Sequence, residues 1–416
     1  MAFETTHAGG LLAARLASEA GDGAWAPSPA FRYGLAAIVA GALGTAVVLL
    51  GRDPQAGALQ LSLILGAAFG FVLQRSRFCF FCIWRDFQDR RDPAGLLGVL
   101  AALAVGIAGY TLVFGAWLPD PSGTRLPPTA HIGPLGPAVL VGGFAFGAGM
   151  AVSGSCISAH LYRLGEGSAA SPFALAGAAL GFVLGFLAWN PLYLRTVSES
   201  PVVWLPRHLG YGGALLLSLA VLAGLALLLL RGRKEPAPPR ASAAPFEAVF
   251  VRTWPAWLGG LAVGAIGVAA YLRVAPLGVT AELGARSRQG ADALGWLPSR
   301  LEGLDALRGC ATVVRDALVT PNGLFVVGLV AAALVAGLLA GAFRVRRPTA
   351  GQLVRAVVGG VLLGFGAMIG LGCTVGTLLS GIMAGAASGW AFAVAMIAGT
   401  ALTLSLGRRL RLLPAA

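Results

Sequence analysis

Long apolar stretches, separated by short polar ones, recur along the whole chain. Apolar runs of about 18 or more residues are typical of membrane-spanning helices. The composition agrees, because 57% of residues are hydrophobic and 11% are charged, whereas soluble domains carry roughly a quarter charged residues. We therefore predict an all-α polytopic membrane protein. It has about ten hydrophobic segments, at 34–51, 58–74, 94–116, 138–162, 171–190, 210–230, 254–272, 321–342, 354–383 and 388–406.

The basic residues are distributed unevenly between the polar stretches. If the N-terminus lies inside, the inner stretches hold 20 of the 30 Lys and Arg residues, as the positive-inside rule requires. Both termini are therefore predicted to be cytoplasmic. This bias also accounts for the net charge of +13. No basic stretch is long enough, or interleaved with aromatic residues enough, to bind nucleic acid, so no such partner is expected.

Two glycine-rich stretches match each other without a gap, GGFAFGAGMAVSGSC at 142–156 and GGVLLGFGAMIGLGC at 359–373. In the orientation above, the first runs from outside to inside and the second runs the opposite way. Such an inverted-topology repeat is typical of secondary transporters, whose broken helices form a site near the bilayer midplane. We predict two broken, glycine-rich, cysteine-bearing helices that meet there. A duplicated bundle without a transport role is the alternative.

The repeat divides the chain into halves with additional segments around them. Segments two to five pair with segments seven to ten, which leaves segments one and six as extra helices. The predicted parts are a cytoplasmic N-terminal segment at 1–33, an extra helix at 34–57, the first half at 58–190, a second extra helix at 191–230, a cytoplasmic linker at 231–253, the second half at 254–406 and a basic tail at 407–416.

Each glycine-rich stretch ends in small and hydroxyl residues around one cysteine. These residues favour a helix break, which a membrane protein tolerates where backbone lines a cavity. A break exposes backbone N–H groups, and helix N-termini attract anions. The candidate substrate-binding residues are Ser155 and Cys156 in the first stretch and Cys373 and Thr374 in the second. Ordinary helix packing by glycine and a space-filling role for cysteine are the alternatives.

A third stretch, QRSRFCFFC at 74–82, follows the second segment on the inner side. Arg75 and Arg77 precede Cys79, and nearby positive charge favours a thiolate, so we add all three to the candidate site. The CxxC spacing to Cys82 is a weak redox signal, because no thioredoxin-like pattern surrounds it. A cluster of cytoplasmic positive charge is the alternative interpretation of the arginines.

The inverted partner of this third stretch is expected after the seventh segment. No cysteine occurs there, and Gly278 and Thr280 are the nearest candidates. Cys310 has no partner in the repeat and is interpreted as structural. No cysteine–histidine spacing suits zinc, and no cofactor is expected.

The motifs GFAFGAGMAVSGSC, GFGAMIGLGCTVG and RSRFC together resemble the YeeE/YedE family of bacterial inner-membrane proteins, over roughly 58–406. The resemblance implies uptake of thiosulfate, with related members handling selenium or other sulfur species. It implies three cysteines along the pathway, at positions that match Cys79, Cys156 and Cys373. It also implies a small cytoplasmic sulfur carrier of the TusA kind as a partner. The sequence SCISAH departs from the family's more usual glycine-rich continuation.

Three functions remain open from the sequence. A transporter would use cysteines at several depths, because thiols can meet the terminal sulfur of thiosulfate and backbone N–H groups can meet its oxygens. A membrane sulfurtransferase would need one activated nucleophile, such as Cys79 or Cys82, and an acceptor. A scaffold for another membrane complex would tolerate the loss of its cysteines.

Overall fold

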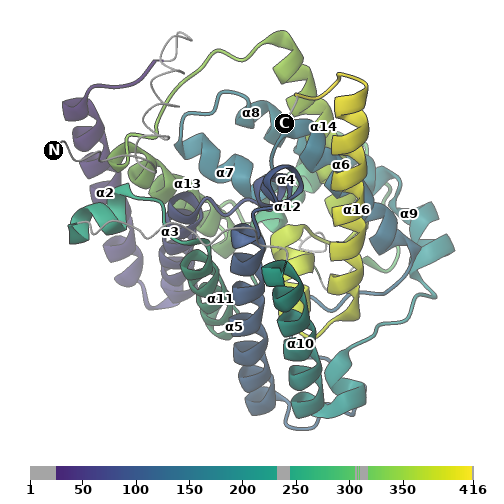
Figure 1. Ribbon diagram of the computed structural model, residues 1–416. Coiled ribbons are helices and arrows are strands. Elements are labelled where there is room, and N and C mark those ends of the chain that lie inside the picture. The colour runs from purple at the N-terminus through teal and green to yellow at the C-terminus, as the bar shows by residue number, and fades with distance from the viewer. Residues whose placement is uncertain (1–24, 232–243, 305–306, 308, 310–316, 415–416) are drawn as a thin grey trace.

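The computed structural model describes residues 25–231, 244–304, 307, 309 and 317–414. Cys310 and most of the predicted N-terminal segment 1–33 lie outside these ranges. The described residues form a helical bundle, in which the long helices stand side by side (Figure 1). Nine of them are long and apolar enough to cross a membrane, or ten if one bent pair is counted as a single span. The prediction of a multi-pass helical protein with about ten segments is confirmed.

The elements follow the predicted hydrophobic segments closely, and most boundaries agree to within a few residues. They are α2 (Pro29–Gly51), η2 (Pro54–Ala56), α3 (Gly57–Ser76), α4 (Phe80–Arg90), α5 (Ala94–Trp117), α6 (Pro137–Ser153), α7 (Ile157–Gly165), α8 (Ser171–Leu187), α9 (Trp189–Leu192), η3 (Tyr193–Val197), α10 (Leu205–Arg231), η4 (Glu247–Val251), α11 (Ala256–Arg273), α12 (Val279–Ala293), α13 (Pro321–Leu339), α14 (Ala350–Ile369), η7 (Thr374–Ser380), α15 (Gly381–Met383) and α16 (Ala387–Arg409).

Two helices occupy polar stretches between the predicted hydrophobic segments. They are α4, which follows α3, and α12, which follows α11. Each carries several charged side chains, so neither forms a continuous hydrophobic segment, and tertiary packing is needed to hold them. The two extra helices, α2 and α10, bury much less of their surface than the other long helices do.

Helices α6 and α14 cross with their backbones in contact. A Cβ added to Gly149 would lie 2.7 Å from the Gly359 carbonyl oxygen, and one added to Gly366 would lie 2.6 Å from the Gly142 carbonyl oxygen. The helices are antiparallel, because the later residue of α6 meets the earlier residue of α14. Only glycine permits so close an approach of two helix backbones. In a membrane, such close packing stabilises the contact between helices, because hydrophobic burial does not favour it there.

The remaining matched glycines pack each of these helices against a second neighbouring helix. Gly147 of α6 packs against the backbone of α16 at Met396, and its counterpart Gly364 of α14 packs against the backbone of α8 at Ala178. Ordinary glycine packing therefore explains this part of both motifs. Two further pairs, α3 with α13 and α5 with α11, join the two halves of the chain in the same manner.

Both predicted helix breaks occur, but they do not lie side by side. The first break, Gly154–Cys156, follows α6, and Gly154 has a φ of 81°. The second break, Gly370–Cys373, follows α14, where even Leu371 has a φ of 57°. Gly142 contacts Gly370, whereas Ser153 contacts Gly359. The two breaks are therefore offset by roughly 16 Å along α6, at 1.5 Å per residue.

The two predicted broken helices therefore contact each other along their glycine faces, while the breaks themselves lie apart, because close backbone contact requires regular helix on both sides. Each break then lies near one end of the α6–α14 contact, so the two cysteines are presented at different levels of the bundle.

Candidate functional site

The first break presents Cys156 at the start of a helix. Cys156 is the N-cap residue of α7, and its sulfur lies 3.2 Å from the Ser158 hydroxyl. The backbone N–H groups of Phe80 and Ala159 also point at this sulfur. Phe80 belongs to α4, so two helix N-termini converge on one thiol. Helix N-termini carry partial positive charge, which makes this a favourable place for an anion.

Cys79 lies beside Cys156 in the same position of its own helix. It caps the N-terminus of α4, and the Cys82 backbone N–H approaches its sulfur at 3.4 Å. The Cys79 and Cys156 side chains are close neighbours, and both are fully buried. These cysteines are free thiols. The structure thus brings together two of the predicted site residues that lie 77 positions apart in the sequence.

Two further residues of this cluster were not among the predicted site residues. The Arg163 guanidinium lies 3.1 Å from the Cys82 sulfur and 3.4 Å from the Gly154 carbonyl oxygen. Arg163 occupies the last turn of α7, two turns after Cys156. Residues 156 and 163 are seven apart and lie on the same face of a helix, so a helix that continues past the break would have placed Arg163 on the same side as Cys156. Arg163 therefore adds a fixed positive charge near the Cys82 and Cys79 thiols.

A wide cavity opens directly from the first break. Its volume is about 750 Å³, and its lining includes Ser153 and Gly154 of the break itself. Glu166 is the one acidic residue among the described residues that line it. The basic residues that line this arginine vestibule are Arg85, Arg163, Arg344, Arg346, Arg347, Arg355 and Arg408. Such a concentration of one charge raises the local concentration of anions.

The second break presents Cys373 in a similar way. Cys373 is the N-cap residue of the π-helix η7, and the N–H groups of Val375 and Gly376 point at its sulfur. The Thr280 hydroxyl of α12 lies beside the thiol. Thr280 therefore occupies the same position beside Cys373 that Cys79 occupies beside Cys156. The sequence had placed it among the candidates for the missing inverted partner.

Buried polar atoms without a partner occur at both breaks. Among the described residues, the hydroxyl oxygens of Thr280 and Thr374 form no hydrogen bond, although each side chain is almost fully buried. At the first break, His160 Nε2 is likewise unpaired, while its Nδ1 contacts Ser171. An unsatisfied buried polar group costs about 1–3 kcal/mol, so each such atom points to a ligand or water that completes it.

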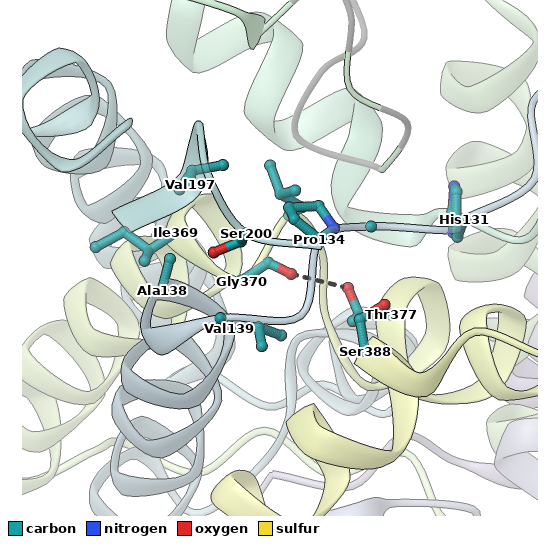
Figure 2. Close-up of a pocket in the computed structure, with 13 residues that line it drawn as sticks. His131, Pro134, Ala138, Val139, Val197, Ser200, Ile369, Gly370, Thr377 and Ser388 are labelled. Atoms are coloured by element: carbon teal, nitrogen blue, oxygen red, sulfur yellow. Dashed lines mark hydrogen bonds between the residues drawn. The ribbon is translucent and has the colours of Figure 1, made fainter. Parts of the chain in front are cut away.

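The cavity at the second break is small. Figure 2 shows it between the start of α6, the end of α14 and the start of α16, with Ser200 and His131 also in its lining. Its volume is about 20 Å³, room for about one water molecule. The Thr377 hydroxyl donates to the Gly370 carbonyl at 3.2 Å, and His131 Nδ1 donates to the Gly376 carbonyl at 3.0 Å. These bonds hold the second break tightly packed.

The other predicted site residues are bound to partners other than the cysteine thiols. Arg75 is buried and donates to Gln74 and to the carbonyl oxygens of Phe250 and Val251, which ties α3 to η4. Arg77 forms an ion pair with Glu166 at 2.6 Å. The Ser155 hydroxyl donates to the Gly154 carbonyl and so stabilises the break.

Comparison with known proteins agrees with these features. Residues 75–402 match a family model described as sulphur transport. The thiosulfate transporter TsuA of Escherichia coli is 26% identical over 354 residues, which cover 81% of this chain and 91% of that protein. TsuA of Spirochaeta thermophila is 27% identical over 355 residues, which cover 81% of this chain and 95% of that protein.

A second group of relatives matches over a shorter region. The probable transporter YedE of Escherichia coli is 24% identical over 209 residues, which cover 49% of this chain and 48% of that protein. The family model itself spans most of the chain and includes both breaks. The chain therefore belongs to the YeeE/YedE family of sulphur-transport membrane proteins, which are transporters and not enzymes.

Proposed function

We propose that this protein carries thiosulfate, or a similar small sulfur-containing anion, into the bacterial cytoplasm across the inner membrane. Both termini lie in the cytoplasm in this proposal, so the arginine vestibule faces inward. The anion meets Cys373 first, passes to Cys156 and Cys79, and leaves past Arg163 into the vestibule. A selenium-containing or other sulfur anion is the variant of this substrate class that the same chemistry would accept.

The observation that carries the proposal is the set of unpartnered buried polar atoms at the breaks. Thr280 and Thr374 flank Cys373; the Thr374 hydroxyl has no partner among the described residues, and the Thr280 hydroxyl has only the Cys373 thiol beside it. A purely structural cysteine would not need polar neighbours that cost free energy to bury. A substrate oxygen completes these hydroxyl groups, while the thiol contacts the substrate's terminal sulfur.

The chemistry at the two breaks suits weak, successive binding. Sulfur–hydrogen contacts are weaker than ordinary hydrogen bonds, so a soft anion is held without being trapped. Conduction through several sites requires that each one also release its ligand. The roughly 16 Å offset between the breaks along α6 provides two such sites at different depths.

An inverted-topology repeat is part of this proposal. Its support is the correspondence of contacts: matched glycines of α6 and α14 pack on α16 and α8, and α3–α13 resembles α5–α11. In transporters of this kind the halves move against each other around a central site. The glycine contact of α6 with α14 is the surface along which such movement occurs.

A small sulfur carrier of the TusA kind is the cytoplasmic partner in this proposal. Its support is the arginine vestibule, which concentrates anions at the inner end of the pathway. Arg346 and Arg347 are exposed at its rim, where they can also meet acidic groups of a docked protein. Electrostatic attraction of this kind acts mainly on the rate of association.

The test is uptake of radiolabelled thiosulfate by purified protein in liposomes. Uptake is measured for the unchanged protein and for Cys156→Ala and Cys373→Ala, with Cys310→Ala as the matched control, since Cys310 has no repeat partner. Loss of uptake in the first two variants, with uptake retained in the control, supports the pathway. Uptake that survives both changes contradicts the pathway. If the unchanged protein takes up no thiosulfate, thiosulfate is not the substrate and the same measurement is made with another sulfur anion.

A further inference from the structure

An apolar groove that the proposed pathway does not use lies between α4, α5, α10 and α16. Its volume is about 420 Å³, and almost all of its lining is hydrocarbon or aromatic. Figure 1 shows α10 standing in front of the bundle between α5 and α16. Leu228 of α10 lines the groove and is 64% exposed, so the groove opens towards the surrounding lipid.

Helix α4 closes one end of this lateral groove with an amphipathic face. Phe80, Ile83, Trp84 and Phe87 all line it, and their spacing places them on one side of the helix. Arg85, Asp86 and Asp89 lie on the other side of α4. A helix with this division lies at a membrane interface, with its apolar side towards the acyl chains.

Arg91 stands at the rim of the groove, directly after α4. Its guanidinium lies 5.9 Å from the centre of the Phe87 ring, and it forms no ion pair with any described residue. The nearby carboxylates are engaged elsewhere. Asp89 binds Arg408 at 2.6 Å, and Asp92 accepts the backbone N–H of Ala94. The positive charge of Arg91 is therefore available to a phosphate group.

We propose that this lateral groove binds an anionic phospholipid, with one acyl chain between α4, α10 and α16 and the phosphate at Arg91. Water is a poor occupant, because the lining offers it almost no polar partners. The groove is open to the bilayer, and its charged rim lies where the interfacial helix α4 ends, which matches the division of a phospholipid into chain and headgroup.

The occupied groove touches both elements that carry the site cysteines. Phe80 follows Cys79, and its N–H points at Cys156. Leu378 and Ile382 belong to η7 and α15, which follow Cys373. The lipid chain thus fills the space between two half-helices whose N-termini present the thiols. The binding proposal itself does not depend on which anion is transported.

The test uses the full chain in lipid nanodiscs that contain a trace of phospholipid with a photoreactive diazirine in its acyl chain. The headgroup is phosphatidylglycerol in one sample and phosphatidylcholine in the other, and labelled residues are identified by mass spectrometry. We expect labelling to concentrate on the groove faces of α4, α10 and α16. A single interfacial arginine contributes about 1 kcal/mol, so phosphatidylglycerol should label about fivefold more than phosphatidylcholine.

Two pairs of measurements make the result specific. Ala393→Trp fills the groove and should abolish labelling there, whereas Val394→Trp, the exposed neighbouring position on α16, should leave it unchanged. Arg91→Gln should remove the preference for phosphatidylglycerol while labelling by phosphatidylcholine stays the same. Circular dichroism and size-exclusion profiles confirm that the variants fold.

Three results would overturn the proposal. The first is groove labelling no stronger than that of the exposed surface of α2. The second is an equal response of Ala393→Trp and Val394→Trp. The third is a stable dimer whose cross-links show that a second copy covers the groove and excludes the probe.

Discussion

The two helix breaks have the same local design but different surroundings. Each has a glycine-rich helix, a cysteine at the N-cap of the next helix and backbone N–H groups near the sulfur. The first break adds two more thiols and a guanidinium and opens into about 750 Å³ of arginine-lined space. The second adds uncharged hydroxyl groups and adjoins a cavity of about 20 Å³.

This difference shows what the repeat specifies and what it leaves free. The glycine contacts are matched in both halves because they set the approach of helix backbones. The residues around each thiol are not matched. In the proposed pathway, the neutral, tightly packed site and the charged, open site would hold the anion with different strengths.

The largest expected effect is on the shared framework. Gly147→Leu and Gly364→Leu would each drive a side chain into a neighbouring backbone, and overpacking costs roughly 1–3 kcal/mol or more. We expect both variants to lose most of the folded protein, to a similar extent. Thermal unfolding and yield in the membrane fraction measure this effect.

Gly34→Leu on α2 is the matched control for the framework, because a Cβ at Gly34 meets nothing within 4 Å. It should leave yield and unfolding temperature unchanged. A large loss in only one of the two framework variants would contradict the equivalence of α6–α16 and α14–α8.

The next largest effect concerns the charge at the first break. Arg163→Gln removes the guanidinium next to Cys82, a charge-assisted contact of about 1.5–3 kcal/mol, so uptake should fall about tenfold or more. Arg163→Lys should recover part of it. Rates at several thiosulfate concentrations check this expectation, with the exposed Arg300→Gln as control. Unaltered uptake in Arg163→Gln would show that the charge has no part in the pathway.

A smaller effect should follow when the two breaks are made more alike. Thr280→Cys gives the second break a thiol neighbour, as Cys79 gives the first, and the two side chains differ little in size. We expect uptake within about threefold of the original, with tighter substrate binding, because a thiol can contact the terminal sulfur. Thr280→Val removes the hydroxyl while keeping the shape, and should weaken uptake more than Thr280→Cys does. The reverse order would indicate that the hydroxyl is only a packing group.

The smallest effect concerns the rim of the arginine vestibule. Arg347→Glu reverses an exposed charge, and the Debye length near 8 Å at physiological salt limits its reach. We expect uptake to change by about twofold at low salt and to converge with the original at high salt. A salt-independent difference would indicate a structural defect at the α13–α14 connection instead of a change in the electrostatic field.

The sequence by itself determined the class of fold and the positions of both breaks. Continuous apolar runs are typical of helices that cross a membrane, so the hydrophobic segments predicted the long helices with few errors. The charged helices α4 and α12 were missed, because hydropathy does not detect helices that tertiary contacts hold. The matched glycines and cysteines, Cys156 and Cys373 among them, marked the breaks directly.

Only the tertiary structure decided which residues share a site. Cys79 meets Cys156, and Thr280 meets Cys373, because chain segments distant in sequence pack together, which one-dimensional spacing does not record. The same packing engages Arg75 and Arg77 in contacts with η4 and Glu166 and brings Arg163 to Cys82. A charge pattern reveals that arginines are present, but hydrogen-bond directions in three dimensions decide which of them face the thiols.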